Sequence, residues 1–223
     1  MISTLGLDIS DRTLEDELEA HVGPPGYWEH QRDVQVAILN HFNVKPRHRV
    51  LEVGTGAMRG GAVITNYLDT GNFFGVEVSE ERFAIGRSVI KLLELECKRP
   101  NLILSRAFGV DEIKPQSIDL VWAFQVIPHM TEEIVRQFVK AIAFHLKPNA
   151  KALFSVRLVA DGPIFSHRGK WQEFPTTNMR REFLDELAEA EGLKMSLHRT
   201  LGDWGMAPEL GGAKNYLVKM SRI

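Results

Sequence analysis

Short apolar runs alternate with segments of helical spacing along this 223-residue chain, and this alternation limits its fold more than any other feature. The runs of strand length are residues 49–53, 73–78, 101–105, 118–124 and 151–156. Segments with apolar residues at helical spacing separate most of them: 59–68, 79–96 and 131–146. Because strands joined by helices of this length form right-handed parallel units, the pattern predicts an α/β fold with a mostly parallel sheet.

Two of these helices have clear start signals. Ser79 and Thr131 are each followed by two glutamates, so each offers a hydroxyl N-cap with acidic residues in the first turn. We expect the third helix to stop at Leu146-Lys147-Pro148-Asn149, where a cation is followed by a proline.

The end of the chain has a different pattern. A helix is expected near 178–191, followed by strands at 193–200 and 214–221. Only 13 residues, rich in glycine, join these two strands, which favours an antiparallel pair at one edge of the sheet.

The beginning of the chain indicates a helical appendage. Residues 13–21 and 29–43 have amphipathic spacing and are separated by Gly23-Pro24-Pro25-Gly26. We therefore predict an N-terminal helical cover over residues 1–45 and one α/β folding unit over residues 46–223.

Composition excludes several classes of protein. The 27 basic and 29 acidic residues give a net charge of −2 without long runs of one sign, so no nucleic-acid or membrane partner is expected. No apolar run reaches the ~20 residues that span a bilayer, and the first ten residues do not resemble a signal peptide. Cys97 is the single cysteine, and no histidine spacing is typical of a metal site. A cytoplasmic, metal-free protein is expected.

A glycine-rich turn after the first strand predicts the ligand site. The sequence Glu52-Val53-Gly54-Thr55-Gly56 leads into the next helix, where a turn permits close backbone approach to a ligand. Arg59 occupies the sixth position of G-x-G-x-x-G, so the dinucleotide pattern fails. Glu52 would repel a pyrophosphate but attract the α-ammonium of a methionine group, which favours S-adenosylmethionine.

A second acidic residue fits either ligand. Glu77 ends the second strand 23 residues after Gly54, the position from which a carboxylate contacts ribose hydroxyls. No tyrosine has a lysine four residues later, so the dyad of short-chain reductases is absent.

Four segments together resemble the class I S-adenosylmethionine-dependent methyltransferases, in particular the type 11/12-like small-molecule group. They are Glu52–Gly56, Gly75–Ser79, Ser117–Phe124 and Leu146–Phe154. The resemblance implies a Rossmann-like three-layer sandwich whose seven-stranded, mostly parallel sheet has an antiparallel last strand. It implies S-adenosylmethionine as cofactor, S-adenosylhomocysteine as product, and methyl transfer to an oxygen or nitrogen of a small molecule.

The resemblance also implies site residues. Glu52 and the 54–60 loop would surround the methionine end, Glu77 the ribose, and the Phe124-Gln125 strand end the sulfonium. The expected cofactor-binding residues are Glu52, Gly54, Thr55, Gly56, Arg59, Gly60, Glu77, Val78, Ala107, Phe108 and Gln125.

The chain departs from the family pattern at two places. Met58 stands where a third glycine is usual, and Arg59 beside it either binds the cofactor carboxylate or caps the strand-to-helix surface. The acidic residue usual after the third strand, which reaches the adenine amino group, is missing. Base recognition would fall to backbone groups and Phe108, with Asp111 as a substitute or as a solvated loop carboxylate.

His129, between the fourth strand and the Thr131 cap, is the candidate general base; a packing or hydrogen-bonding role is the alternative. Three segments could form the acceptor pocket: 26–30, 157–177 and 201–213. Their candidate acceptor-binding residues are Tyr27, Trp28, Arg168, Trp171 and Trp204. The alternatives are a helix anchor for Tyr27 and Trp28, and a plain surface loop for 157–177.

Two other functions stay open at this point. One is a nicotinamide-nucleotide-dependent oxidoreductase on a Rossmann sheet, and the other is a non-catalytic protein that binds S-adenosylmethionine. The expected partner is a small-molecule acceptor, and a homodimer stays open.

Overall fold

The computed structural model describes residues 1–4, 7, 12–160 and 177–223, which form two compact units. Met1–Gly109 is unit 1 and Val110–Ile223 is unit 2, and each is described by itself. The predicted division into 1–45 and 46–223 is a different partition and stays a prediction. Among the described residues, no helix has both the length and the apolar character that a membrane span requires.

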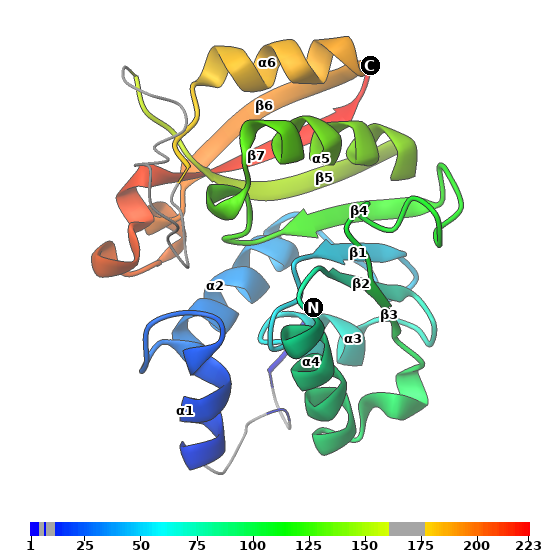
Figure 1. Ribbon diagram of the computed structural model, residues 1–223, viewed down its shortest axis with the longest axis vertical. Helices are drawn as coiled ribbons and strands as arrows, with labels where there is room; N and C mark the ends of the chain where they lie inside the picture. The colour runs from blue at the N-terminus through cyan, green and yellow to red at the C-terminus, as the bar shows by residue number, and fades with distance from the viewer. Residues whose placement is uncertain (5–6, 8–11, 161–176) are drawn as a thin grey trace. The chain divides into compact units, whose positions relative to one another are not determined.

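Unit 1 contains two parallel strand pairs with helices between the strands (Figure 1). Its elements are α1 (Arg12–Ala20), α2 (Trp28–His41), β1 (Val50–Val53), α3 (Gly61–Tyr67), β2 (Phe73–Glu77), α4 (Glu80–Leu92), the 3-10 turn η1 (Leu95–Lys98) and β3 (Asn101–Leu104). β2 pairs with β1 on one side and β3 on the other, in a register that sets Glu52 opposite Gly75 and Glu77 opposite Leu104. The carboxyl ends of the three strands therefore lie at one edge.

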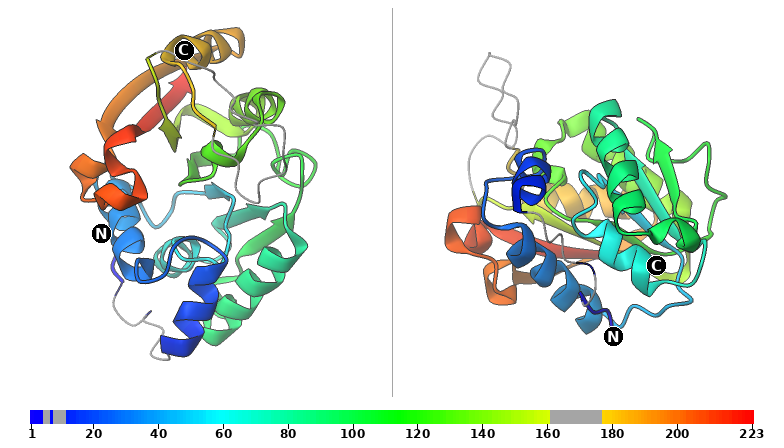
Figure 2. Two further views of the ribbon diagram at one scale, coloured as in Figure 1. Left: turned by 60° about the vertical axis from the view of Figure 1, so that its left-hand side comes forward. Right: turned by 90° about the horizontal axis from the view of Figure 1, so that it is seen from below.

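The N-terminal helix lies beside α4 within unit 1, as both Figure 1 and the left view of Figure 2 show. Arg82 Nε on α4 donates to the carbonyl of His21, just after α1, over 3.1 Å. His21 Nδ1 also lies 3.8 Å from Glu81 Oε1. These two contacts attach the end of α1 to the start of α4.

Unit 2 contains the mixed part of the sheet, with α5 and α6 next to each other (Figure 1). Its elements are β4 (Ile118–Ala123), η2 (Ile127–His129), α5 (Glu132–His145), β5 (Leu146–Arg157), α6 (Arg181–Ala190), β6 (Leu193–Thr200), η3 (Gly202–Trp204), η4 (Pro208–Leu210), η5 (Gly212–Lys214) and β7 (Asn215–Arg222). β4 and β5 are parallel, whereas β7 is antiparallel to both β5 and β6. Phe138 of α5 meets Phe154 of β5 edge to face in the core, with ring centroids 5.3 Å apart.

The strand order is β3-β2-β1-β4-β5-β7-β6 in a seven-stranded sheet. This confirms the predicted α/β, Rossmann-like fold with an antiparallel last strand. The order also differs from that of the dinucleotide-binding fold, which runs 3-2-1-4-5-6 without an antiparallel strand between the last two.

Most helix boundaries agree with the sequence signals, but one helix end does not. Ser79 Oγ accepts from the Arg82 N–H and Thr131 Oγ1 from the Ile134 N–H, which confirms both predicted N-caps. The helix predicted over 79–96 ends earlier, at Leu92, because Glu94 adopts a left-handed φ of 55°.

The strand predicted over 151–156 is longer than its apolar run. β5 begins at Leu146, directly after α5 ends at His145, and Pro148 lies inside it. Lys147 Nζ contacts Asp119 Oδ2 of β4 at 2.7 Å, so an ion pair anchors the polar start of this strand.

Candidate functional site

The glycine turn after β1 has the tight geometry expected for a ligand loop. Gly54, Gly56 and Met58 all have positive φ, at 73°, 53° and 62°. Met58 thus takes a left-handed conformation that costs a non-glycine residue energy, and its side chain is fully buried. A Cβ at Gly61 would lie 2.8 Å from Met58 Cε and one at Gly86 3.1 Å from its Cγ, so these two glycines make room for the methionine.

Glu77 fastens this turn to the end of β2. Its Oε2 accepts from the Gly56 N–H at 2.8 Å, and its Oε1 accepts from Val78 and Ser79 at 2.9 and 3.0 Å. A carboxylate offers about four acceptor positions, so about one is left after these three bonds. Glu77 can therefore still accept one hydroxyl hydrogen bond from a ligand.

Glu52 is a buried carboxylate with an unsatisfied oxygen. Its side chain lies at the end of β1, and Oε2 has no hydrogen-bond donor among the described residues. Burial raises the pKa of Glu52 to about 8; the nearby positive charge of Arg59 opposes this shift and Glu77 adds to it. Glu52 Oε2 is therefore a buried acceptor to which a ligand could donate a hydrogen bond.

Arg59 is a buried guanidinium with unsatisfied donors. Nη2 donates to Gln31 Oε1 at 2.7 Å, and the guanidinium lies 5.9 Å from the ring centroid of Trp28. Nε and Nη1 find no acceptor in the described part of the chain. Burial lowers the pKa of Arg59 to about 10, against the opposing charges of Glu19 and Glu52. The site thus holds unused acceptors and unused donors around one turn.

The α1–α2 segment packs on the glycine turn. A Cβ at Gly56 would lie 2.7 Å from Val22 Cγ1, and one at Gly60 would overlap the Gln35 amide. Glu19, fully buried, accepts from the N–H groups of Gly26 and Tyr27 at 2.5 and 2.6 Å and so fixes the start of α2. Glu19, Gln31 and Gln35 were not among the predicted site residues; the signal for the two glutamines was their spacing of one turn on a half-apolar helix.

Tyr27 and Trp28, the two N-terminal aromatic residues predicted for the acceptor, have different surroundings. Trp28 is buried and lies against Arg59, so within unit 1 it anchors α2 to the turn. Tyr27 is half-buried, with its ring edge-on to His30 at 6.1 Å between centroids. An acceptor role for either residue stays a prediction.

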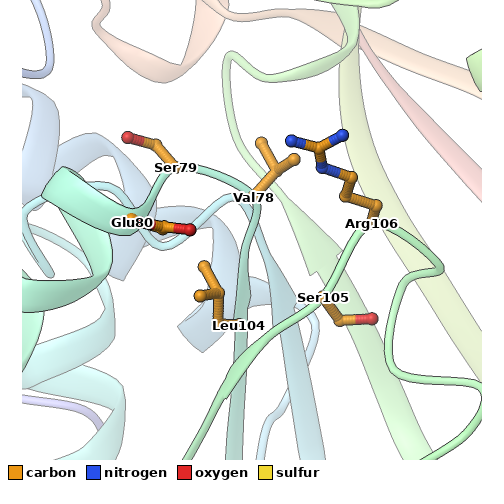
Figure 3. Close-up of a pocket in the computed structure, with 6 residues that line it drawn as sticks. All are labelled: Val78, Ser79, Glu80, Leu104, Ser105 and Arg106. Carbon is orange, nitrogen blue, oxygen red and sulfur yellow. The ribbon is translucent and has the colours of Figure 1, made fainter.

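A pocket of about 450 Å³ opens at the carboxyl ends of β2 and β3 (Figure 3). Its lining residues are Val78, Ser79, Glu80, Leu104, Ser105 and Arg106. Of these, only Val78 was predicted. Ala107 and Phe108 follow directly: Ala107 N–H donates to Ser105 Oγ, and Phe108 is buried with φ of 56°. Asp111 is exposed, in unit 2.

Unit 2 carries Gln125 directly beyond β4. Gln125 has φ of 58°; its N–H donates to Ser155 Oγ at 2.7 Å and its Nε2 lies 3.4 Å from Met206 Sδ. The 201–213 segment thus contacts the β4 end within this unit. Trp204 in the same segment is half-buried, with the Arg199 guanidinium 5.6 Å from its ring centroid.

His129 ends η2 with an exposed side chain. The loop around it is well held, because Thr177 Oγ1 donates to the Met130 carbonyl and the Thr177 N–H to the Pro128 carbonyl. Arg168 and Trp171, also predicted for the acceptor, lie outside the described residues. In the part of the chain that the structure describes, no group of acidic, histidine or cysteine side chains could hold a metal ion.

No protein-family model and no curated protein sequence matches the chain. Solved structures do. The glycopeptide N-methyltransferase MtfA in complex with sinefungin is 15% identical, with a TM-score of 0.62 over 86% of this chain and 94% of its own. A TehB-like S-adenosylmethionine-dependent methyltransferase from Corynebacterium glutamicum is 13% identical, with a TM-score of 0.58 over 95% of each chain.

A third similar structure is the [4+2]-cyclase SpnF, 14% identical, with a TM-score of 0.63 over 87% of this chain and 82% of its own. Together with the strand order, these likenesses show that the chain has the fold of the class I S-adenosylmethionine-dependent methyltransferases.

Proposed function

We propose that the protein transfers a methyl group from S-adenosylmethionine to an oxygen or nitrogen of a small-molecule acceptor. The observation that carries the proposal is the pair of unsatisfied buried groups at the glycine turn. Glu52 Oε2 lacks a donor, and Arg59 Nε and Nη1 lack acceptors. A free amino acid group supplies both, since its ammonium donates to a carboxylate and its carboxylate accepts from a guanidinium.

This complementarity also disfavours a dinucleotide. A pyrophosphate has no donor for Glu52 and no positive charge that would stabilise its ionised form. MtfA is in complex with sinefungin and the TehB-like protein depends on S-adenosylmethionine, and both molecules carry an amino acid group attached to an adenosine. These neighbours support the assignment of the cofactor.

The rest of the nucleoside has complementary groups in unit 1. The spare acceptor position of Glu77 suits a ribose hydroxyl, and the neighbouring pocket at Val78 suits the base. Phe108 and Ala107, directly after the pocket residues, are assigned to the same region.

S-adenosylmethionine, when bound, supplies an activated methyl group, so the protein mainly has to orient the acceptor. An acceptor hydroxyl or ammonium must also lose a proton, and we assign its removal to His129, whose side chain is exposed in the loop beyond β4. Gln125 is assigned to orientation, because two contacts fix its unusual conformation. Trp204 supplies an aromatic surface for the acceptor.

Transfer of labelled methyl groups tests the proposal. The full chain is incubated with methyl-labelled cofactor and fractionated metabolite pools, beside a Glu52→Gln variant and a His129→Ala variant. We expect label in a small-molecule fraction with the wild type, strongly reduced transfer with Glu52→Gln, and a lowered rate at saturating cofactor with His129→Ala.

The alternatives give different results. A protein that binds S-adenosylhomocysteine but transfers no label to any pool is the non-catalytic binding protein, and the neighbouring cyclase SpnF shows that this fold also carries other chemistry. Label found in nucleic acid or protein instead would overturn the small-molecule assignment. Unchanged turnover of His129→Ala would remove the histidine from proton transfer.

A further inference from the structure

The pocket beside Val78 has two polar side chains that can recognise a base. Of its two serines, Ser79 Oγ accepts from the Arg82 N–H as the α4 cap. Ser105 Oγ accepts from the N–H groups of Ala107 and Gly109 at 3.2 and 3.3 Å. Both serine oxygens thus accept hydrogen bonds from backbone N–H groups. The two charged side chains of the pocket, Glu80 and Arg106, are the groups that we consider for recognition of a ligand.

The walls of the pocket suit a flat apolar ring. Val78, just beyond the buried strand β2, is 58% exposed, and Leu104, at the end of the edge strand β3, is 41% exposed. In Figure 3, the Arg106 guanidinium extends toward Val78, and the Ser105 hydroxyl points away from the other labelled side chains. No ion pair or hydrogen bond of the guanidinium is found among the residues that the structure describes.

Arg106 places a cation after the third strand, where this fold usually has a carboxylate. A guanidinium only donates, whereas the 6-amino group of adenine needs an acceptor. Its two-pronged match on a purine edge is O6 with N7, as in a 6-oxopurine. Glu80, on the opposite wall, can accept from a ring N–H or an amino group.

We propose that Arg106 sets the base selectivity of the cofactor pocket, so that the pocket binds a 6-oxopurine nucleoside at least as well as a 6-aminopurine nucleoside. This inference rests on the proposed function, and it concerns the base alone. Recognition of the amino acid group by Glu52 and Arg59 does not depend on it.

Titration with S-adenosylhomocysteine and its deaminated form, S-inosylhomocysteine, tests the proposal by calorimetry on the full chain. For the wild type we expect dissociation constants within about threefold of each other, or tighter binding of the inosine form. Arg106→Ala should weaken the inosine form by about tenfold or more relative to the adenosine form, as expected for loss of a two-pronged contact. Arg106→Asp should prefer the adenosine form.

Arg87→Ala, an exposed arginine of α4 outside this pocket, is the control and should leave both constants unchanged. Arg106 is also exposed, so its variants should fold, which thermal melting verifies. Wild-type binding of the adenosine form with more than tenfold rejection of the inosine form would overturn this proposal alone. Equal losses for both ligands in Arg106→Ala would do the same. If neither ligand binds the wild type, the proposed function also fails.

Discussion

Glu77 Oε2 accepts a hydrogen bond from the Gly56 N–H over 2.8 Å, and so joins the end of β2 to the turn that follows β1. The same carboxylate holds the start of the next turn through Val78 and Ser79. One side chain therefore fixes two backbone segments that the proposed cofactor would contact, which links stability to binding in this region.

Glu77→Gln should lower both stability and nucleoside affinity. The amide offers one oxygen where the carboxylate offers two, so at least one buried N–H loses its acceptor at a cost of about 1–3 kcal/mol. Urea denaturation and titration with S-adenosylhomocysteine measure the two effects. Glu96→Gln, an exposed glutamate of η1, is the control. Wild-type stability in Glu77→Gln would show that these hydrogen bonds do not hold the turn.

Glu52 should make the stability of the ligand-free protein depend on pH. Its pKa is about 8 in the folded chain against an ordinary 4.5, so between these values the folded state binds more protons than the unfolded state. Stability must then fall as pH rises through this window and level off above it. Relative to Glu52→Gln, we expect the wild type to lose on the order of 2–4 kcal/mol between about pH 5 and about pH 8. If the unfolding free energies of the wild type and of Glu52→Gln changed with pH in parallel, the raised pKa of Glu52 would be contradicted.

Arg59→Met should distinguish the two roles that the sequence leaves open. If Arg59 binds the cofactor carboxylate, the variant loses about tenfold or more in affinity for S-adenosylhomocysteine, as for a charge-assisted hydrogen bond. Its affinity for 5′-methylthioadenosine, which lacks the amino acid group, should stay the same. Equal losses for both ligands would instead indicate that Arg59 only supports the turn through Gln31 and Trp28.

Gly61→Ala should destabilise the protein by about 1–3 kcal/mol, because the added Cβ overpacks the buried site. It would lie 2.5 Å from Glu52 Oε2 and 2.8 Å from Met58 Cε. A Met58→Ala change in the same chain should restore part of the loss, since it removes one of the two clashes. Chemical denaturation of the single and double variants checks this, and fully additive losses would contradict the proposed contact.

The sequence predicted the strands and both helix caps because these depend on local signals: continuous apolar runs, and a hydroxyl ahead of two glutamates. It also placed Glu52, Glu77 and Gln125 correctly at strand ends. The early start of β5 escaped prediction because Lys147 and Pro148 interrupt its pattern, and a contact with Asp119, 28 residues away, anchors it.

The polar surroundings of the site could not be predicted for the same reason. Gln31 reaches Arg59 across 28 residues, and Glu19 fixes the start of α2 through backbone N–H groups. Although the glutamine spacing marks one face of α2, no local pattern indicates which groups these side chains bond. The sequence showed only that the usual carboxylate after the third strand is absent. That Arg106 lines a pocket together with Glu80 could be learned only from the structure.

The proposed cofactor site is tested by calorimetric titration of the full chain with S-adenosylhomocysteine and with NADH, beside the same titrations of Glu52→Gln. We expect the wild type to bind one S-adenosylhomocysteine per chain and to release a proton near pH 7, because Glu52 ionises against the ligand ammonium. Glu52→Gln should bind weakly and release no proton. Tight binding of NADH with no response to S-adenosylhomocysteine would contradict the proposed cofactor site.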